Sequence, residues 1–412
     1  MDNSRQIQPS NRFPEFSSSG SWDYVPGNEL FIPIVNKNHN SDLPVLAITQ
    51  DQGAVPRDLI DYNVIVSDKS IAGYKVVEIG DFIISLRSFQ GGIEYSNYKG
   101  LCSPAYIVLR RKNDTICNDF YRHYFKSKKY IQDLNRNLEG IRDGKMISYQ
   151  QFSEIKIPFP SLAEQKRIAE CLSTIDEAIA ENNSKLELLK SHKKGLIQKL
   201  FPAKGQKIPE LRFKEFLDKG EWEMKRLGDI TEMYAGATPS TIVSEYWIDG
   251  TIPWMSSGEV NNGQIFRTEK KITKLGFENC STKLVPPNSV VVALAGQGKT
   301  RGMVAITRIE LCTNQSLCSI IPNETFDSDF LYFYLRGKYE YLRQISSGDG
   351  TRGGLNLQML KDFVVPFPPL AEQKRIAECL SSMDKMIAEY NTKLELLKSH
   401  KKGLMQQLFP NS

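Results

Sequence analysis

Two segments of the chain carry apolar residues at alternating spacings of four and three positions, which is typical of helices that pair with other helices. In the first segment these residues are Ile168, Leu172, Ile175, Ile179, Leu186 and Leu189. In the second segment they are Ile376, Leu380, Met383, Ile387, Leu394 and Leu397. The pattern predicts two long helices, and each narrow apolar stripe requires a partner surface.

The two helical segments are copies of each other. Residues 158–202 and 366–410 align at an offset of 208 positions, and 36 of the 45 aligned positions are identical. Ser161 and Glu164 form a capping-box pattern at the first start, and Pro369 suits the first turn of the second helix. We expect the copies to pair as an antiparallel coiled coil. The alternative is that each helix packs on the block before it.

The blocks before the helices combine short strand patterns with a late helical stretch. Residues 22–157 contain FIPIV, LPVLAIT, YNVIV, KVVEIGDFIISL and AYIVLR, followed by a helical pattern near 119–138. Residues 222–365 contain TIPWMSS, SVVVALAG, GMVAITRI and LCSIIP, followed by a helical pattern near 326–345. Both blocks therefore predict an α+β fold.

The repeat also defines the expected domain organisation. A first α+β domain covers residues 1–157 and a first long helix covers 158–202. A linker and second α+β domain cover 203–365, and the second long helix covers 366–412. Short echoes, NRFPEF at 11–16 with LRFKEF at 211–216, open the two halves, so the chain has a pseudo-two-fold internal repeat.

Composition places the chain among water-soluble globular proteins. Of its 412 residues, 40% are hydrophobic and 25% are charged, and no apolar run approaches the roughly 20 residues of a membrane span. The polar N-terminal sequence has no signal-peptide pattern, which favours the cytoplasm. Seven cysteines without a CxxC pair favour reduced thiols. The sequence shows neither a metal-ligand pattern nor a catalytic constellation, so we expect a binding protein without its own cofactor.

The net charge of +5 arises from 53 basic and 48 acidic groups, and no segment carries more than +2. Any contact with DNA must therefore come from local clusters. Two Gly-rich basic loops lie at matched places before the helices, and flexible loops of this composition supply donors for phosphates and base edges. Their candidate DNA-binding residues are Arg136, Arg142 and Lys145 in the first loop, and Arg343, Arg352 and Asn356 in the second.

The sequence AGQGKT at 295–300 is similar to a phosphate-binding loop but departs from it. The position of the first glycine is occupied by Ala293, and the following RGMVAI suggests a strand rather than a helix. We therefore interpret Gln297, Lys299 and Arg301 as polar contacts to a ligand such as DNA. A nucleotide hydrolase that uses Lys299 is a weaker alternative.

The duplicated PFPxLAEQKRIAECL and LELLKSHKKGL segments, the paired RFxEF openings, GATPS at 236–240 and QGKTRG at 297–302 resemble a specificity subunit of a type I restriction-modification system. The resemblance covers nearly the whole chain. It implies two target recognition domains, each of which binds one half of a split DNA sequence. It also implies that the antiparallel helices fix the gap between the half-sites.

The same resemblance implies partners and cofactors. Two methyltransferase subunits would dock on the helices and the restriction and motor subunits would join them, while S-adenosylmethionine, ATP and Mg would belong to these partners. The chain itself would be a noncatalytic reader of double-stranded DNA. The alternative is a coiled-coil scaffold with two ligand-binding blocks and no role with DNA.

Overall fold

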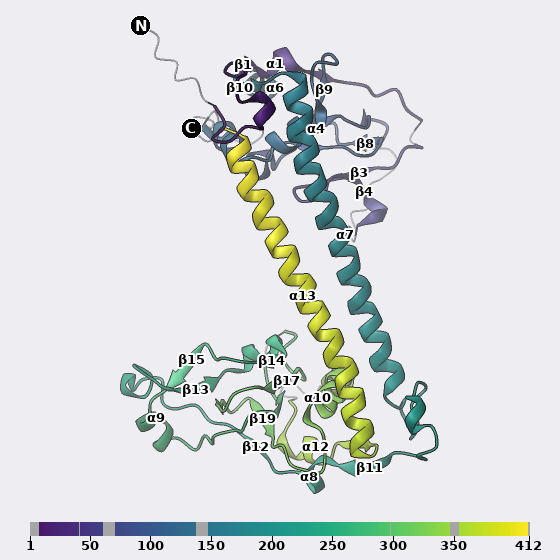
Figure 1. Cartoon of the computed structure of the whole chain (residues 1–412), viewed down its shortest axis with the longest axis vertical. Helices are drawn as coiled ribbons and strands as arrows, with labels where there is room; N and C mark the ends of the chain where they lie inside the picture. Colours follow the sequence, from purple (N-terminus) through teal and green to yellow (C-terminus); the bar gives the residue numbers. More distant parts are fainter. Residues whose placement is uncertain are drawn as a thin grey trace. The chain divides into compact units, whose positions relative to one another are not determined.

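The computed structural model describes residues 8–40, 42–60, 71–136, 147–296, 298–346 and 354–410. The chain divides into two compact units: unit 1 comprises residues 1–183 and 392–412, and unit 2 comprises residues 184–391. Helix α7 (Leu162–Leu200) begins in unit 1 and ends in unit 2, whereas α13 (Leu370–Leu408) begins in unit 2 and ends in unit 1 (Figure 1).

The centre of unit 1 is a four-stranded antiparallel sheet with strand order β2-β9-β6-β7. Its strands are β2 (Phe31–Ile34), β9 (Ile107–Arg111), β6 (Phe82–Ile84) and β7 (Glu94–Tyr95). Three smaller pairs surround it: β1 (Asp23–Pro26) with β10 (Lys156–Phe159), β3 (Leu46–Thr49) with β4 (Gly53–Pro56), and β5 (Lys75–Val77) with β8 (Gly100–Cys102). The predicted strand YNVIV lies outside the described residues.

Short helices complete unit 1. They are α1 (Gly27–Leu30), α3 (Ser88–Gly91), α4 (Asn118–Tyr124), α5 (Lys128–Arg136) and α6 (Tyr149–Glu154). The predicted helical stretch near 119–138 is thus two helices, α4 and α5. Aromatic side chains of α4 and of the sheet form the largest buried cluster of this unit, so the late helices close its core.

Unit 2 has a five-stranded sheet with order β12-β19-β16-β17-β14 and a three-stranded sheet with order β15-β13-β18. The first comprises β12 (Met233–Ala235), β19 (Leu317–Ile320), β16 (Val290–Ala293), β17 (Val304–Thr307) and β14 (Gln264–Ile265). The second comprises β15 (Lys270–Ile272), β13 (Ile252–Met255) and β18 (Cys312–Thr313). A separate pair joins β11 (Glu223–Arg226) to β20 (Val364–Phe367).

The helices of unit 2 follow the order of those of unit 1, except that α9 precedes β16 whereas α3 follows β6. They are α8 (Leu227–Ile230), α9 (Lys274–Glu278), α10 (Ser328–Gly337), α11 (Tyr339–Ile345) and α12 (Leu357–Lys361). The predicted α+β fold, with strands first and helices late, is confirmed in both units.

The two blocks also share a short segment of similar sequence and structure. Residues 113–124 and 323–334 form the same turn and helix, in which Asn113 and Asn323 accept hydrogen bonds from the backbone N–H groups of Thr115 and Thr325 at 3.0 and 2.8 Å. Five of these twelve aligned positions are identical.

The two long helices run antiparallel within each unit. In unit 1, Ile168 and Leu172 of α7 share a buried cluster with Leu408 near the end of α13. Asp176, further along α7, forms an ion pair with Lys401, which precedes Leu408 on α13. The predicted antiparallel pairing is therefore present, although the first turns of α7 also pack on the preceding block.

The residues of the predicted coiled-coil seam are all buried or half-buried. Those that are fully buried are Ile168, Leu172, Leu186, Ile376, Leu380, Met383 and Leu394. Those that are half-buried are Ile175, Ile179, Leu189, Ile387 and Leu397. The polar Asn182 is buried on the same stripe, and its Nδ2 donates to the carbonyl of Ala178 at 2.7 Å.

The start of each long helix is fastened to its block by a buried ion pair. In unit 1, Arg12 forms two hydrogen bonds to Glu164, at 2.8 and 2.6 Å. In unit 2, Arg212 forms the equivalent bonds to Glu372, at 2.7 and 2.8 Å. A bidentate pair of this kind fixes both distance and orientation. It explains why the RFxEF opening and the EQKRI segment recur together.

The predicted capping box is only half formed. The N–H of Glu164 donates to Ser161 Oγ at 3.3 Å, as expected. The Glu164 carboxylate does not accept the backbone N–H of Ser161, because the carboxylate is paired with Arg12. The neighbouring Gln165 adds a second connection, since its Oε1 accepts the N–H of Cys117 at 2.8 Å.

The end of each long helix places a phenylalanine in the core of the block other than the one immediately before that helix. At the end of α13, Phe409 packs against Phe120 and Tyr124 of unit 1, with ring centroids 5.5 and 5.6 Å apart. At the end of α7, Phe201 packs in the same way against Phe330 and Tyr334 of unit 2, at 5.3 and 5.4 Å. The duplicated LFP sequences thus supply core residues.

Candidate nucleic-acid interface

Three loops of unit 2, residues 236–240, 294–302 and 313–317, meet at one end of the five-stranded sheet. Gly236 permits this approach, because a Cβ at that position would lie 1.9 Å from the carbonyl oxygen of Thr313. Backbone hydrogen bonds join the loops, from Gly236 to Leu317, from Ala237 to Thr313 and from Leu294 to Ser316. The result is one surface built from segments that lie far apart in the sequence.

Two of the predicted DNA-binding clusters meet on this surface. The hydroxyl of Tyr339 donates to the carbonyl oxygen of Lys299 at 2.8 Å, and Arg343 Nη1 donates to the Tyr339 hydroxyl at 2.9 Å. The Lys299 side chain is exposed, and Arg301 is half-buried. Arg301 Nε is buried and has no hydrogen-bond partner among the described residues.

The loop geometry does not support nucleotide hydrolysis at Lys299. Strands β16 and β17 flank the loop and pair antiparallel, so no helix opens behind Lys299. Gly302, with φ of +79°, turns the chain back into β17. A phosphate-binding loop of the hydrolase type requires a helix N-terminus at this point.

Three more residues of unit 2 were predicted to bind DNA: Asn356, Gln297 and Arg352. Asn356 caps α12, because its Oδ1 accepts the N–H of Met359 at 2.9 Å, which gives this side chain a structural role. Gln297 and Arg352 lie outside the described residues. A hydrogen bond between Thr238 and Gln315 joins two of the loops, and neither residue was predicted individually. The signal was available in the GATPS segment, which contains Thr238.

In unit 1, Arg136 is the last residue of α5 and is 71% exposed, with an ion pair to Asp133 at 3.6 Å. Arg142 and Lys145 lie outside the described residues. The equivalent of the 294–302 loop is residues 85–92, because each loop follows the corresponding strand of its sheet, β6 or β16. None of its residues was predicted, although the loop contains Arg87, Gly91 and Gly92.

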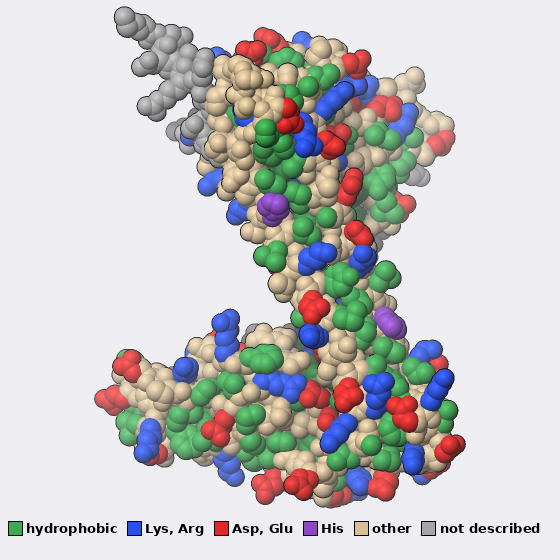
Figure 2. All heavy atoms as spheres, viewed as in Figure 1, with side chains coloured by type: hydrophobic (Ala, Val, Ile, Leu, Met, Phe, Trp, Pro, Cys, Tyr) green, Lys and Arg blue, Asp and Glu red, His purple; other side chains and the backbone are tan. Residues whose placement is uncertain are grey.

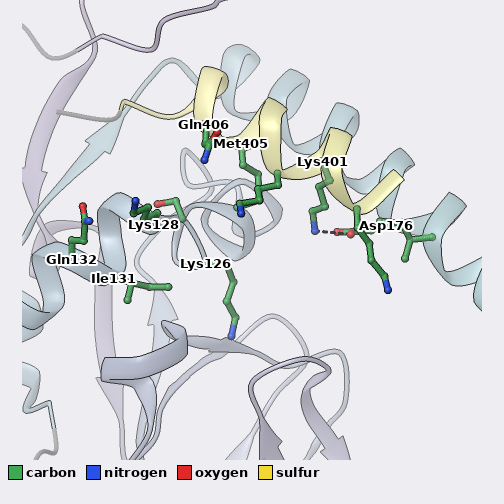
Figure 3. Close-up of a pocket in the computed structure, with 12 residues that line it drawn as sticks. Lys126, Lys128, Ile131, Gln132, Asp176, Lys401, Met405 and Gln406 are labelled. Atoms are coloured by element: carbon green, nitrogen blue, oxygen red, sulfur yellow. Dashed lines mark hydrogen bonds and ion pairs between the residues drawn. The ribbon is translucent and has the colours of Figure 1, made fainter. Parts of the chain in front are cut away.

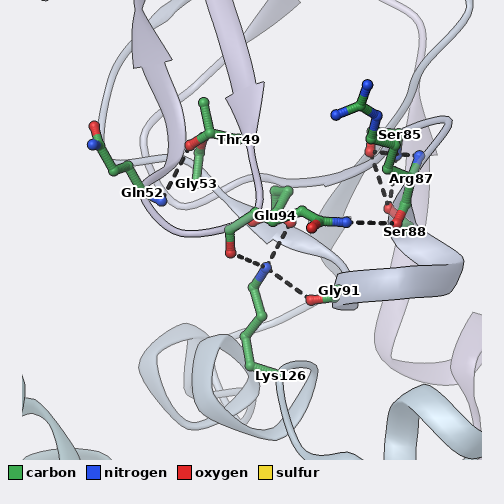
Figure 4. Close-up of polar contacts among 10 residues, drawn as sticks. Thr49, Gln52, Gly53, Ser85, Arg87, Ser88, Gly91, Glu94 and Lys126 are labelled. Atoms are coloured by element: carbon green, nitrogen blue, oxygen red, sulfur yellow. Dashed lines mark hydrogen bonds and ion pairs between the residues drawn. The ribbon is translucent and has the colours of Figure 1, made fainter. Parts of the chain in front are cut away.

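Polar contacts join the loop at residues 85–92 to three other segments of unit 1 (Figure 4). Lys126, just after α4, forms an ion pair with Glu94 at 2.6 Å and donates to the carbonyl oxygens of Gln50 and Gly91 at 3.1 and 3.0 Å. Gln50 Nε2 in turn donates to the carbonyl oxygen of Arg87 at 3.3 Å. The β3–β4 turn, the loop after β6 and the end of α4 are thereby held together.

A pocket of 270 Å³ lies beside the Glu94–Lys126 pair, and amide side chains contribute to its lining: Gln50, Gln52 and Asn97. Glu94 is 1% exposed, and its Oε2 has no hydrogen-bond partner among the described residues. Burial raises the pKa of Glu94 and lowers the pKa of Lys126, while their attraction opposes both shifts. The pocket therefore offers both donors and acceptors, as base edges require.

Charge is mixed over the visible faces of both units, where Lys and Arg alternate with Asp and Glu (Figure 2). Within the described ranges no group of three or more His, Cys, Asp or Glu could hold a metal ion. No helix in those ranges is long and apolar enough to span a membrane. All seven cysteines are free thiols, of which Cys102, Cys312 and Cys318 are buried and the other four are half-buried.

Two α+β units with matched polar loop surfaces, joined through a duplicated antiparallel helix pair, define a bipartite recognition protein. Residues 29–191 and 219–399 each match the family described as the type I restriction modification DNA specificity domain. The chain belongs to this family. This membership does not favour the alternative of a scaffold without a role with DNA.

Individual relatives support the same assignment. The chain is 34% identical to the type I restriction enzyme MjaIX specificity subunit of Methanocaldococcus jannaschii over 46% of this chain and 43% of that protein. It is 30% identical to the EcoR124I/EcoR124II specificity subunit of Escherichia coli over 60% of this chain and 59% of that protein. These two matches thus span about half of each relative, whereas 28% identity to the putative MjaX subunit of M. jannaschii covers 80% of it.

Solved structures show the same fold. The type I restriction-modification S subunit from M. genitalium superposes with a TM-score of 0.61 at 16% identity, over 98% of this chain and 100% of that chain. A chain from a study of complex assembly and conformational transition of the type I R-M system gives a TM-score of 0.57 at 18% identity, over 95% and 98%.

Proposed function

We propose that this chain is the noncatalytic DNA-reading subunit of a type I restriction-modification complex, and that each unit reads one half of an asymmetric, interrupted target. The observation that carries the proposal is a single scaffold built twice with different loop surfaces. In unit 2 the surface carries Lys299, Arg301 and Arg343, while in unit 1 it carries an amide-lined pocket beside Glu94. Two units of related topology that carry different loops suit two different half-sites.

The chemistry of these loops suits the major groove. Arginine and lysine pair with guanine, glutamine and asparagine pair with adenine, and a carboxylate accepts from cytosine. Gln297 and Arg352 remain predicted contacts of the second half-site, and Arg136, Arg142 and Lys145 remain predicted contacts of the first. Asn356 is a weaker candidate, because its Oδ1 already caps α12.

Under this proposal the long helices set the separation of the half-sites and bind two methyltransferase subunits. Residues 185–196 and 393–404 are identical, and they include Leu188 and Leu396, which are 69% and 66% exposed. Large exposed apolar residues at matched positions suit two copies of one partner. Restriction and motor subunits join this complex, and the partners supply S-adenosylmethionine, ATP and Mg.

Methylation mapping tests the proposal. Co-expression of the chain with its methyltransferase subunit should methylate adenine in one asymmetric motif with an unspecified gap. Replacement of residues 222–365 by the corresponding block of a related subunit should change one half of the motif and leave the other half and the gap intact. A continuous motif, or a change in both halves, would contradict the proposal.

A further inference from the structure

A hollow of 630 Å³ in unit 1 is lined by residues from the start of α5, the middle of α7 and the last turns of α13 (Figure 3). Five of its twelve lining residues are lysines, and Asp176 is its one acidic residue. The lysines are Lys126, Lys128, Lys398, Lys401 and Lys402. The net charge of each long helix does not reveal this local excess of positive charge, because each helix as a whole is nearly neutral.

Only part of this charge is neutralised within the protein. Lys401 forms an ion pair with Asp176, and Lys126 forms one with the buried Glu94. Lys398 is paired with Glu395 at 3.1 Å, but both side chains are exposed and the pair is therefore weak. Lys128 and Lys402 take part in no ion pair among the described residues. We call Lys128, Lys398 and Lys402 the lysine shelf.

Unit 2 carries a matched set of cations. Lys190 and Lys194 correspond to Lys398 and Lys402 through the helix repeat, and Lys338 corresponds to Lys128 through the duplicated helices α4 and α10. Lys193, the equivalent of Lys401, forms an ion pair with Asp384, the equivalent of Asp176. In both units, one lysine of the KK sequence is therefore used within the protein, and the next is left without an ion pair in the described ranges.

The lysine shelf adjoins the amide-lined pocket of unit 1. Lys126, Asp176, Lys401 and Met405 line both cavities. A duplex that contacts the amides of that pocket therefore passes beside the hollow that the lysines line. A lysine ammonium is a point charge on a flexible stem and lacks the planar fork that selects a base, so it suits phosphate contact.

We propose that the lysine shelf binds backbone phosphates of duplex DNA, and that Lys190, Lys194 and Lys338 do the same in unit 2. This inference rests on the proposed function and extends it to the helices. The repeated helices then act as DNA-contacting elements as well as spacers. The contacts add affinity without sequence preference, because phosphates are the same at every base pair.

The test compares the wild-type chain with a Lys128→Gln/Lys402→Gln variant, each assembled with its methyltransferase subunits. The plot of log K against log salt concentration has a negative slope, and we expect its magnitude to decrease by about 0.9 for each lost phosphate contact, hence by about 2 for the double variant. Affinity should fall on target and unrelated duplexes alike, and the methylated motif should not change. Adding Lys194→Gln should decrease the magnitude of the slope by about one more.

Lys166→Gln is the matched control, because Lys166 is exposed on α7 and does not line the hollow. An unchanged slope in the double variant, with normal binding by the wild type, overturns the inference and leaves the proposed function intact. Failure of the wild-type complex to bind any duplex contradicts the proposed function itself. Loss of the methyltransferase subunit from the variant would instead assign the shelf to a protein partner and overturn the inference.

Discussion

His123 of α4 distinguishes unit 1 from unit 2, where the equivalent position is occupied by Phe333. The imidazole is 2% exposed, and its Nε2 lies 3.3 Å from Ser173 Oγ. Burial, followed by the positive charges of Lys401 and Arg122, lowers its pKa to about 3, although the nearby Asp176 acts in the opposite direction. His123 is therefore neutral at pH 7.

This pKa makes unit 1 sensitive to acid. The unfolded chain protonates His123 near pH 6.5 and the folded chain only near pH 3, so stability is lost as pH falls through this interval. The loss should reach roughly 2 kcal/mol at pH 5. His123→Phe, which copies unit 2, should abolish that part of the loss. Urea unfolding at pH 7 and pH 5 measures it.

His400→Gln provides the control, because His400 is exposed on α13 of the same unit. It should retain the wild-type pH dependence. An equal loss of stability at pH 5 in His123→Phe and in the wild type would show that other groups cause the acid sensitivity.

At the scale of elements, the ends of the long helices are core components of the units in which they terminate. Phe409 is 1% exposed and Phe201 is 4% exposed. Their rings fill equivalent places between a phenylalanine and a tyrosine of α4 or α10. Each unit is consequently completed by the helix that arrives from the other half of the sequence.

We predict that Phe409→Ala destabilises unit 1 by about 3–5 kcal/mol, because it removes a buried ring and leaves a cavity. Hydrogen exchange should increase in α4, whereas exchange in α10 should stay near its wild-type rate. Phe201→Ala is the matched variant and should show the reverse pattern. Faster exchange of α10 in Phe409→Ala would mean that the insertions do not act locally.

At the scale of the whole molecule, the duplication predicts two equal binding sites for one partner. Leu188→Asp should remove one of the two methyltransferase subunits and Leu396→Asp the other, because each places a carboxylate in an apolar contact. The double variant should bind none. The mass of the purified complex measures the stoichiometry, and Leu275→Asp, which changes an exposed leucine of α9 rather than of a long helix, is the control.

A complex that keeps two methyltransferase subunits in the Leu188→Asp/Leu396→Asp variant would place the partner on another surface. Loss of both subunits in either single variant would indicate that the two sites depend on each other.

Several features were predictable from local sequence. The 4,3 spacing identified the helices, and the repeat identified their antiparallel pairing. The strand-like RGMVAI correctly argued against a phosphate-binding loop at Lys299, since β17 follows it. The role of Asn356 as a helix cap was not recognised, although an Asn directly before a short apolar helix is a common cap.

The sequence by itself determined the two long helices, the α+β blocks and their duplication, because periodicity and internal repetition are properties of neighbouring residues. Only the tertiary structure decided that the 294–302 loop meets Tyr339 and Arg343, and that Lys126 is held by Glu94. It also decided which block receives each helix end. These contacts join residues far apart in the chain, and their geometry depends on how the backbone closes between them, which local patterns do not specify.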